Sequence, residues 1–407
     1  MAKPLQNQRF KASIIVAAVL LLANLAPVKA KPLLPVAITE QQLTQAIKLS
    51  TDYLLRQIRS DGSFVYRINI NPKVRFGEKY NWLRHAGTLY SLADSYSASK
   101  RPDVLAKIEK GVAHLRQASL GPVKEFPGAK ALWSAPKITG QTGPLTAKLG
   151  GAGLGLVAMT SLQRAKPGSV PEADLQGLGR FILAMQRPDG SFFSKYTPSL
   201  GGRDGNWVSL FYPGEAALGL TMLYEMDRNP IWLEGARKTL QFLSNSRARA
   251  AEVPVDHWAL IATQRLWPFL DDKDRATYKR HARQIIDKIL KGQVWEKSLL
   301  HGGFNRRGLT TGSATRLEGL LSSEFIFRDD PEFHDQLRLS ISWGIRFLLR
   351  AQITYGDYRG AIPRSVARMA GQSKKARNFN MRASEVRIDY VQHALSAFVG
   401  YLKLVKP

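Results

Sequence analysis

Acidic, basic and aromatic side chains gather where six predicted helices begin. Seven of these residues have side chains that could take part in catalysis: Tyr212, Glu215, Asp256, His257, Glu318, Asp389 and Tyr390. Seven more could bind a substrate: Asn81, Arg84, His85, Trp258, Arg316, Arg387 and His393. Because helix N-termini carry partial positive charge and free N–H groups, this placement favours an anionic substrate.

Two reaction schemes fit these residue types. Hydrolysis of a sugar linkage needs two carboxylates about 5–10 Å apart, and Glu215, Asp256, Glu318 and Asp389 are the candidates. Epimerisation or β-elimination at a uronic acid needs an arginine to bind the sugar carboxylate and a tyrosine or histidine to exchange the C5 proton. The sequence slightly favours the second scheme, because arginine and tyrosine are as abundant here as carboxylates and the chain is basic. The arginines that could bind the sugar carboxylate in this second scheme are Arg84, Arg316 and Arg387. The residues that could exchange the C5 proton are Tyr212, Tyr390, His257 and His393.

Some of these residues also have a purely structural interpretation. Glu215 in a first helical turn would complement the helix dipole, and Asp256 is a candidate N-cap. Thr315 and Glu318 have the spacing of a capping box, which favours a capping role for Glu318. His85 and His393 could likewise be hydrogen-bonded residues of the core.

The sequence predicts neither a metal nor a cofactor. It has no cysteine, which excludes disulfides, thiolate zinc sites and cysteine nucleophiles. It has no His-Glu-x-x-His motif, and its seven histidines lack tight ligand spacing.

The helices that must position these residues come in pairs. Apolar residues at helical spacing predict a first pair at 41–57 and 80–97. Further outer helices are expected near 102–117, 172–187, 230–246, 273–292 and 332–353. Their inner partners are expected near 148–165, 212–227, 255–270, 313–327 and 387–404. Six helical hairpins of about 60 residues each exceed the common solenoid periods.

A short motif recurs at the end of three outer helices. Gln186 to Phe192 and Gln352 to Tyr358 both fit Gln-x3-Gly-x-aromatic, and Gln57 to Phe64 fits with one extra residue. Glycine makes the turn after a helix, glutamine can bond loose backbone groups, and the aromatic ring packs back over the turn.

This repeat resembles that of the (α/α)6 toroids, the six-hairpin glycosidase-like and terpenoid-cyclase-like proteins. The resemblance implies an all-α fold with inner and outer rings of helices. The missing cysteine removes the zinc prenyltransferase, lanthionine cyclase and thioester branches. The segments 80–87 (YNWLRHAG) and 212–216 (YPGEA) are similar to pieces of glucuronyl C5-epimerase-type toroids.

Residues 1–30 have the pattern of a secretory signal peptide. Three basic residues precede an apolar stretch from Ile14 to Leu25, and Val28-Lys29-Ala30 offers a cleavage site. An uncleaved N-terminal anchor is the alternative. Either way we expect a periplasmic or secreted protein, with residues 31–407 forming a single toroid domain and no membrane span after cleavage.

The formal charge of +27 indicates a polyanionic partner. Loss of residues 1–30 removes four basic residues and no acidic one, which leaves +23. Export makes nucleic acid an improbable partner, so we expect an acidic polysaccharide or an anionic cell-envelope component. The connections 119–148 and 357–387 are basic and should form a cationic rim where the inner helices begin.

The sequence therefore predicts an exported protein that binds and modifies an acidic polysaccharide as an epimerase, lyase or hydrolase. The alternative is a non-catalytic glycan- or envelope-binding protein with the same cationic rim.

Overall fold

Six consecutive pairs of helices make up most of the computed structural model, which describes residues 37–406 except residue 78. The outer helices are α2 (Glu40–Gln57), α4 (Pro102–Ser119), α7 (Glu172–Met185), α9 (Pro230–Arg247), α11 (Asp272–Lys291) and α13 (Pro331–Ala351). The inner helices are α3 (Trp82–Ser99), α6 (Leu149–Ala165), α8 (Tyr212–Asp227), α10 (His257–Leu266), α12 (Thr310–Ser323) and α15 (Ile388–Val405). The predicted signal peptide lies outside the described residues.

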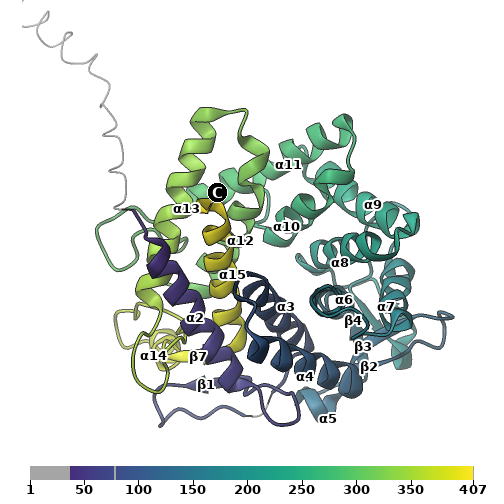
Figure 1. Ribbon diagram of the computed structural model, residues 1–407, viewed down its shortest axis with the longest axis horizontal. Coiled ribbons are helices and arrows are strands. Elements are labelled where there is room, and N and C mark those ends of the chain that lie inside the picture. Colours follow the sequence, from purple (N-terminus) through teal and green to yellow (C-terminus); the bar gives the residue numbers. More distant parts are fainter. Residues whose placement is uncertain (1–36, 78, 407) are drawn as a thin grey trace, which may run out of the picture. The chain divides into compact units, whose positions relative to one another are not determined.

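The inner helices pack against one another as a closed ring. Contacts run from α3 to α6, α8, α10, α12 and α15, and α15 packs back on α3 (Figure 1). The outer helices cover this ring, each packed against the inner helices of its own and the neighbouring pair. This arrangement confirms the predicted ring of six helical hairpins.

Inner helix α6 is buried nearly all round because its neighbours in the ring and the outer helices cover it. In α6 every residue from Leu149 to Thr160 is buried, and four of them are glycines: Gly150, Gly151, Gly153 and Gly155. A Cβ on Gly153 would lie 2.7 Å from the backbone of Glu215, so glycine there lets α6 and α8 approach closely. Close packing is thus one role of the glycine cluster.

Short strands, which helical periodicity cannot reveal, lie in the connections to the inner helices. One antiparallel sheet has the order β2-β3-β4-β5-β6, formed by Leu120–Pro122, Lys130–Ser134, Thr146–Lys148, Lys195–Thr197 and Gly202–Asp204. A second pairs β1 (Arg67–Asn69) with β7 (Glu385–Arg387). Strands β4 and β7 end directly before α6 and α15, so the sheets hold the segments from which inner helices start.

Of two helix-capping predictions, one is confirmed and the other is wrong. Asp256 is the N-cap of α10, and its Oδ1 accepts a hydrogen bond from the Ala259 N–H at 3.1 Å. The Thr315–Glu318 capping box is wrong, because α12 begins at Thr310 and places Glu318 in the middle of the helix. Within residues 37–406, no helix combines the length and the apolar character that a bilayer span requires.

Two of the three glutamines of the repeat motif connect neighbouring outer helices. Gln186 donates through Nε2 to the Gly235 carbonyl of α9 at 2.9 Å, and Gln352 donates to the Ala46 carbonyl of α2 at 2.8 Å. The prediction that glutamine bonds backbone groups is confirmed, but these two partners belong to the next outer helix. Gln57 instead donates to the Tyr53 carbonyl of its own helix at 3.5 Å. In the sixth pair Gly360, rather than Gly356, makes the close turn, with a Cβ position 1.9 Å from the Leu49 carbonyl oxygen.

Replacing Gly190 with alanine should destabilise the fold. Gly190 has φ +88°, and a Cβ there would lie 2.2 Å from the Lys238 carbonyl oxygen of α9. Left-handed strain and overpacking together should lower the free energy of unfolding by about 2–5 kcal/mol, measured by urea denaturation. Gly168 is the matched control, since its φ is +82° and no atom lies within 4 Å of its Cβ position. Equal losses of unfolding free energy in the Gly190 and Gly168 variants would show that the close approach of Gly190 to α9 does not contribute to stability.

Candidate active site

A pocket of about 560 Å³ opens where the inner helices begin. Ten of the fourteen residues singled out from the sequence line it: Asn81, Arg84, Tyr212, Glu215, His257, Trp258, Arg316, Arg387, Asp389 and His393. They come from five inner helices and from the residues directly before them, because a closed ring of helices turns the same end of every inner helix toward one mouth.

Four of the singled-out residues do not line the pocket. His85 is fully buried, hydrogen-bonds the Tyr80 hydroxyl at 2.7 Å, and burial lowers its pKa to about 3. Asp256 is fully buried and uses both carboxylate oxygens, one as the N-cap and one on Arg247 at 2.9 Å. Tyr390 donates its hydroxyl to Glu385 at 2.8 Å. Glu318 lies behind the pocket wall, against His393.

Asp389 holds two of the pocket arginines. Arg84 Nε donates to Asp389 Oδ2 at 3.0 Å, and Arg387 contacts both carboxylate oxygens at 2.5 and 2.8 Å. Burial alone would raise the pKa of Asp389, but Arg387 and then Arg84 hold it below its usual range. The carboxylate is therefore ionised and neutralises part of the charge of the two arginines.

Arg316 is the pocket arginine without a carboxylate partner among the described residues. Its Nη1 donates to the Gly312 carbonyl at 2.6 Å, one turn earlier in α12. Burial lowers the pKa of Arg316, although an arginine stays charged in proteins. A half-buried cation with unused N–H donors is suited to bind the carboxylate of a ligand.

Two histidines of different character lie beside Arg316. The rings of His257 and His393 are 5.8 Å apart, edge to face, and His257 Nε2 is buried without a hydrogen-bond partner among the described residues. Burial lowers the pKa of His257 well below 6.5, and the charges of His393 and Arg316 lower it further. Burial also acts to lower the pKa of His393, but the Glu318 carboxylate at 2.7 Å more than offsets this and raises it.

The two histidines are therefore suited to opposite roles, His257 as a base and His393 as an acid. His257 is neutral and can accept a proton, whereas His393 is favoured as the imidazolium and can donate one. Neighbouring groups whose pKa values are driven apart are a recurring arrangement in acid–base catalysis.

The protonated form of Glu215 is favoured in this pocket. Its Oε2 is buried without a hydrogen-bond partner among the described residues. Burial, and then the charge of Asp256, raises the pKa of Glu215 well above 4.5. A Cβ on Gly150 would lie 2.1 Å from this oxygen and 2.3 Å from the Tyr212 ring, so Gly150 leaves room for both side chains.

The pocket also has an aromatic wall that the sequence analysis did not select. Trp207 is 40% exposed, packs edge to face on Tyr212, and has Lys195 Nζ 4.2 Å from its ring centroid. Phe211 packs edge to face on His257. Both residues precede α8, so aromatic residues in the loop before an inner helix are the signal that could have revealed them.

The basic connection 357–387 reaches the same mouth through β7. Of its basic residues, Arg387 lines the pocket. Arg382 pairs with Glu385 at 2.8 Å, and Arg364 lies over the Phe379 ring. Arg382 and Arg364, which belong to the predicted cationic rim, therefore interact with other residues of the same connection.

Three donors around the histidine pair also have a spacing that a metal ion could bridge. The ligand atoms of His257, Glu318 and His393 all lie within 4.8 Å of one another. The sequence did not predict this cluster, because its members come from α10, α12 and α15. His393 and Glu318 already hydrogen-bond each other directly, so the arrangement satisfies both of these groups without a metal.

Comparison with known proteins finds the same fold. No protein-family model matches the chain, and a search of curated proteins gives no significant match. The solved structure of a D-mannose isomerase matches at 12% identity and TM-score 0.64, over 91% of this chain and all of that one. A sugar epimerase from a ruminal bacterium matches at 10% identity and TM-score 0.65, over 91% and 100% of the two chains. The α-1,6-mannanase of Salegentibacter sp. HEL1_6 matches at 10% identity and TM-score 0.60, over 89% and 100%.

At these identities the similarity concerns the fold. The matched proteins have the same two rings of helices, and the match extends over nearly the whole of each. The chain is therefore an (α/α)6 toroid of six helical hairpins, as the repeat motif predicted.

Proposed function

We propose that the protein is an exported carbohydrate-active enzyme that removes the C5 proton of a uronic acid unit in an acidic polysaccharide. The observation that carries this proposal is the group formed by neutral His257, the unpaired cation Arg316 and the His393–Glu318 pair. The reaction would end in epimerisation if a proton returns to C5, or in β-elimination if the substituent at C4 leaves.

Hydrolysis is less well supported, because it needs two free carboxylates. Asp389 is held by two arginines, Asp256 by Arg247, and Glu318 by His393. That leaves Glu215, which can act as an acid but has no free carboxylate opposite it. Proton abstraction next to a carboxylate fits these pairings better than hydrolysis does.

In the proposed first step, Arg316 binds the sugar carboxylate and His257 accepts the C5 proton. The bound carboxylate neutralises Arg316 and so removes one of the charges that lower the pKa of His257. The base therefore becomes stronger when substrate is present. The negative charge that develops at C5 spreads into the carboxylate next to it, where Arg316 stabilises it.

The second step depends on which group supplies a proton. In elimination, the C4–O bond breaks, a C4–C5 double bond forms, and His393 protonates the departing oxygen. In epimerisation, a donor must reach the opposite face of the sugar, and Tyr212 on the neighbouring helix α8 is the candidate. Burial raises the pKa of Tyr212, so it remains a phenol that can donate.

An incubation in D₂O with uronate polymers tests the proposal. Deuterium at C5 without new chain ends indicates an epimerase, and unsaturated chain ends indicate a lyase. New saturated reducing ends without deuterium at C5 would instead show a hydrolase. Binding with no chemical change would favour the non-catalytic glycan-binding alternative, which the charge of +27 also suits.

Glu318→Gln should shift the alkaline limb of the pH–activity profile to lower pH. The Glu318 carboxylate raises the pKa of His393 above 6.5, so activity that needs the imidazolium is lost as pH rises through that pKa. Without the Glu318 carboxylate, burial dominates and lowers the pKa of His393. The activity is then lost at a lower pH. The measurements are kcat/KM against pH and NMR titration of His393. An unchanged titration would show that Glu318 does not control this histidine.

A further inference from the structure

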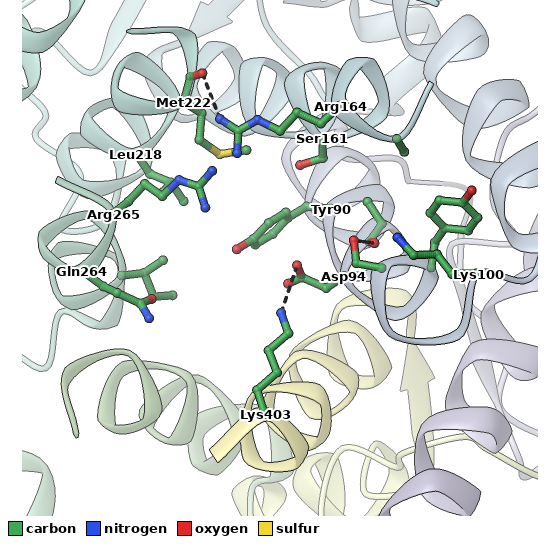
Figure 2. Close-up of a pocket in the computed structure, with 15 residues that line it drawn as sticks. Tyr90, Asp94, Lys100, Ser161, Arg164, Leu218, Met222, Gln264, Arg265 and Lys403 are labelled. Atoms are coloured by element: carbon green, nitrogen blue, oxygen red, sulfur yellow. Dashed lines mark hydrogen bonds and ion pairs between the residues drawn. The ribbon is translucent and has the colours of Figure 1, made fainter. Parts of the chain in front are cut away.

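A second polar cavity lies at the opposite mouth of the ring. It has a volume of about 360 Å³ and lies between the C-terminal halves of α3, α6, α8 and α10 and the end of α15 (Figure 2). It shares no lining residue with the candidate active site. Small-molecule sites commonly measure about 300–1,000 Å³, so the cavity is large enough for a small ligand.

Unsatisfied hydrogen-bonding groups point into this cavity. The Tyr90 phenol projects toward its centre, with Asp94 beside it on the same helix (Figure 2). The Tyr90 hydroxyl makes no hydrogen bond to any described residue. The nearest cation to Asp94 is Lys403 Nζ at 4.0 Å, which leaves the carboxylate oxygens free to accept hydroxyl groups.

Two arginines are fixed at one side of the same cavity. Arg265 Nε donates to Glu225 Oε2 at 3.0 Å, and Arg164 contacts the same oxygen and also the Met222 carbonyl at 3.3 Å. One carboxylate thus holds two guanidinium groups, which leaves one positive charge in excess. Cations at helix C-termini often bond only the last carbonyls. Here an inward phenol and carboxylate accompany them, and helix capping does not require these groups.

We propose that this cavity binds a small acidic sugar, a uronate monosaccharide or disaccharide. The sugar carboxylate would lie against Arg265 and Arg164, and its hydroxyl groups would bond Asp94, Tyr90 and the Gln264 amide. An arginine pair is suited to a carboxylate, and a carboxylate with an amide is suited to neighbouring hydroxyls. The inference goes beyond the proposed reaction and stands without it, because the two sites use different side chains.

Calorimetric titration of glucuronate and galacturonate into the His257→Gln, Arg316→Gln double variant tests this inference. The double variant should have no turnover and a weakened candidate active site. Saturable binding to it would therefore occur in the cavity at the opposite mouth. We expect binding to persist there, and to weaken at least tenfold when Asp94→Asn or Gln264→Ala is added. Neither substitution removes a short ion pair, and melting temperatures verify that the variants fold.

Three results would overturn the proposal. Binding that is absent in the double variant but present in the wild type would place the sugar in the active site alone. An affinity that neither Asp94→Asn nor Gln264→Ala changes would show that the sugar binds outside this cavity. Acetate or phosphate binding as tightly as the sugars would show an anion site without sugar recognition. The D₂O experiment is independent of all three, so failure of one proposal leaves the other intact.

Discussion

His257→Gln should lower kcat on a uronate polymer by about 10²–10⁴-fold, the usual contribution of a positioned general base. Glutamine has a similar size and can still hydrogen-bond, but it cannot accept the C5 proton. His257 lies on the pocket wall, with Nε2 buried and unpartnered among the described residues. Removal of the ring should therefore affect proton transfer more than substrate binding. The measurements are kcat, KM and the rate of deuterium incorporation at C5.

His85→Gln is the matched control for this variant. His85 is also a buried histidine of an inner helix, but it lies outside the pocket and bonds Tyr80 and Gly111. Its replacement should lower the free energy of unfolding and leave the kcat of the folded protein unchanged. Full turnover by a correctly folded His257→Gln variant would remove His257 from the proposed mechanism.

Arg316→Gln should lower kcat/KM on a uronate polymer by about 10–100-fold, since a hydrogen bond to a charged group contributes about 1.5–3 kcal/mol. The loss should be specific to the carboxylate. Wild-type protein should prefer a free uronate polymer to its methyl ester, and the variant should lose this preference. The kcat/KM of Arg316→Lys should fall between those of the wild type and of Arg316→Gln, because lysine keeps the charge but not the paired N–H donors.

The same substitution should also alter the acid limb of the pH profile. After burial and His393, the charge of Arg316 lowers the pKa of His257, which must be neutral to act as a base. Removal of Arg316 raises that pKa, so activity should be lost at a higher pH as the solution is acidified. Arg306→Gln is the control, because Arg306 is 80% exposed and pairs with Glu296 outside the pocket. Equal effects of the two variants would show that only overall charge matters.

The helices and their pairing were predictable from the sequence because both depend on local signals. Apolar residues at helical spacing mark each helix, and the turn glycines separate the pairs. The Gln-x3-Gly-x-aromatic motif indicated a ring because two of its glutamines make the same kind of contact with the next outer helix. The Thr315–Glu318 spacing gave a wrong capping-box prediction, because residues of these types three positions apart also occur inside helices.

The gathering of polar residues at one mouth was predictable too, since a ring of alternating helices turns every inner helix the same way. The sequence could not tell which of these residues face the pocket. Residues such as Arg84 and His85 are neighbours in the chain, yet one lines the pocket and the other lies in the core. A helix places successive side chains about 100° apart, so its rotation in the packed ring decides which one is exposed.

The sequence by itself determined the all-α class, the six hairpins and the mouth at which the candidate residues lie. The tertiary structure decided the chemical character of each residue, because that depends on partners far away in the chain. Asp389 accepts a hydrogen bond from Arg84, 305 positions away, and His393 is held by Glu318, 75 positions away. Burial then determines the pKa of His257 and Glu215, and burial exists only once the ring has closed.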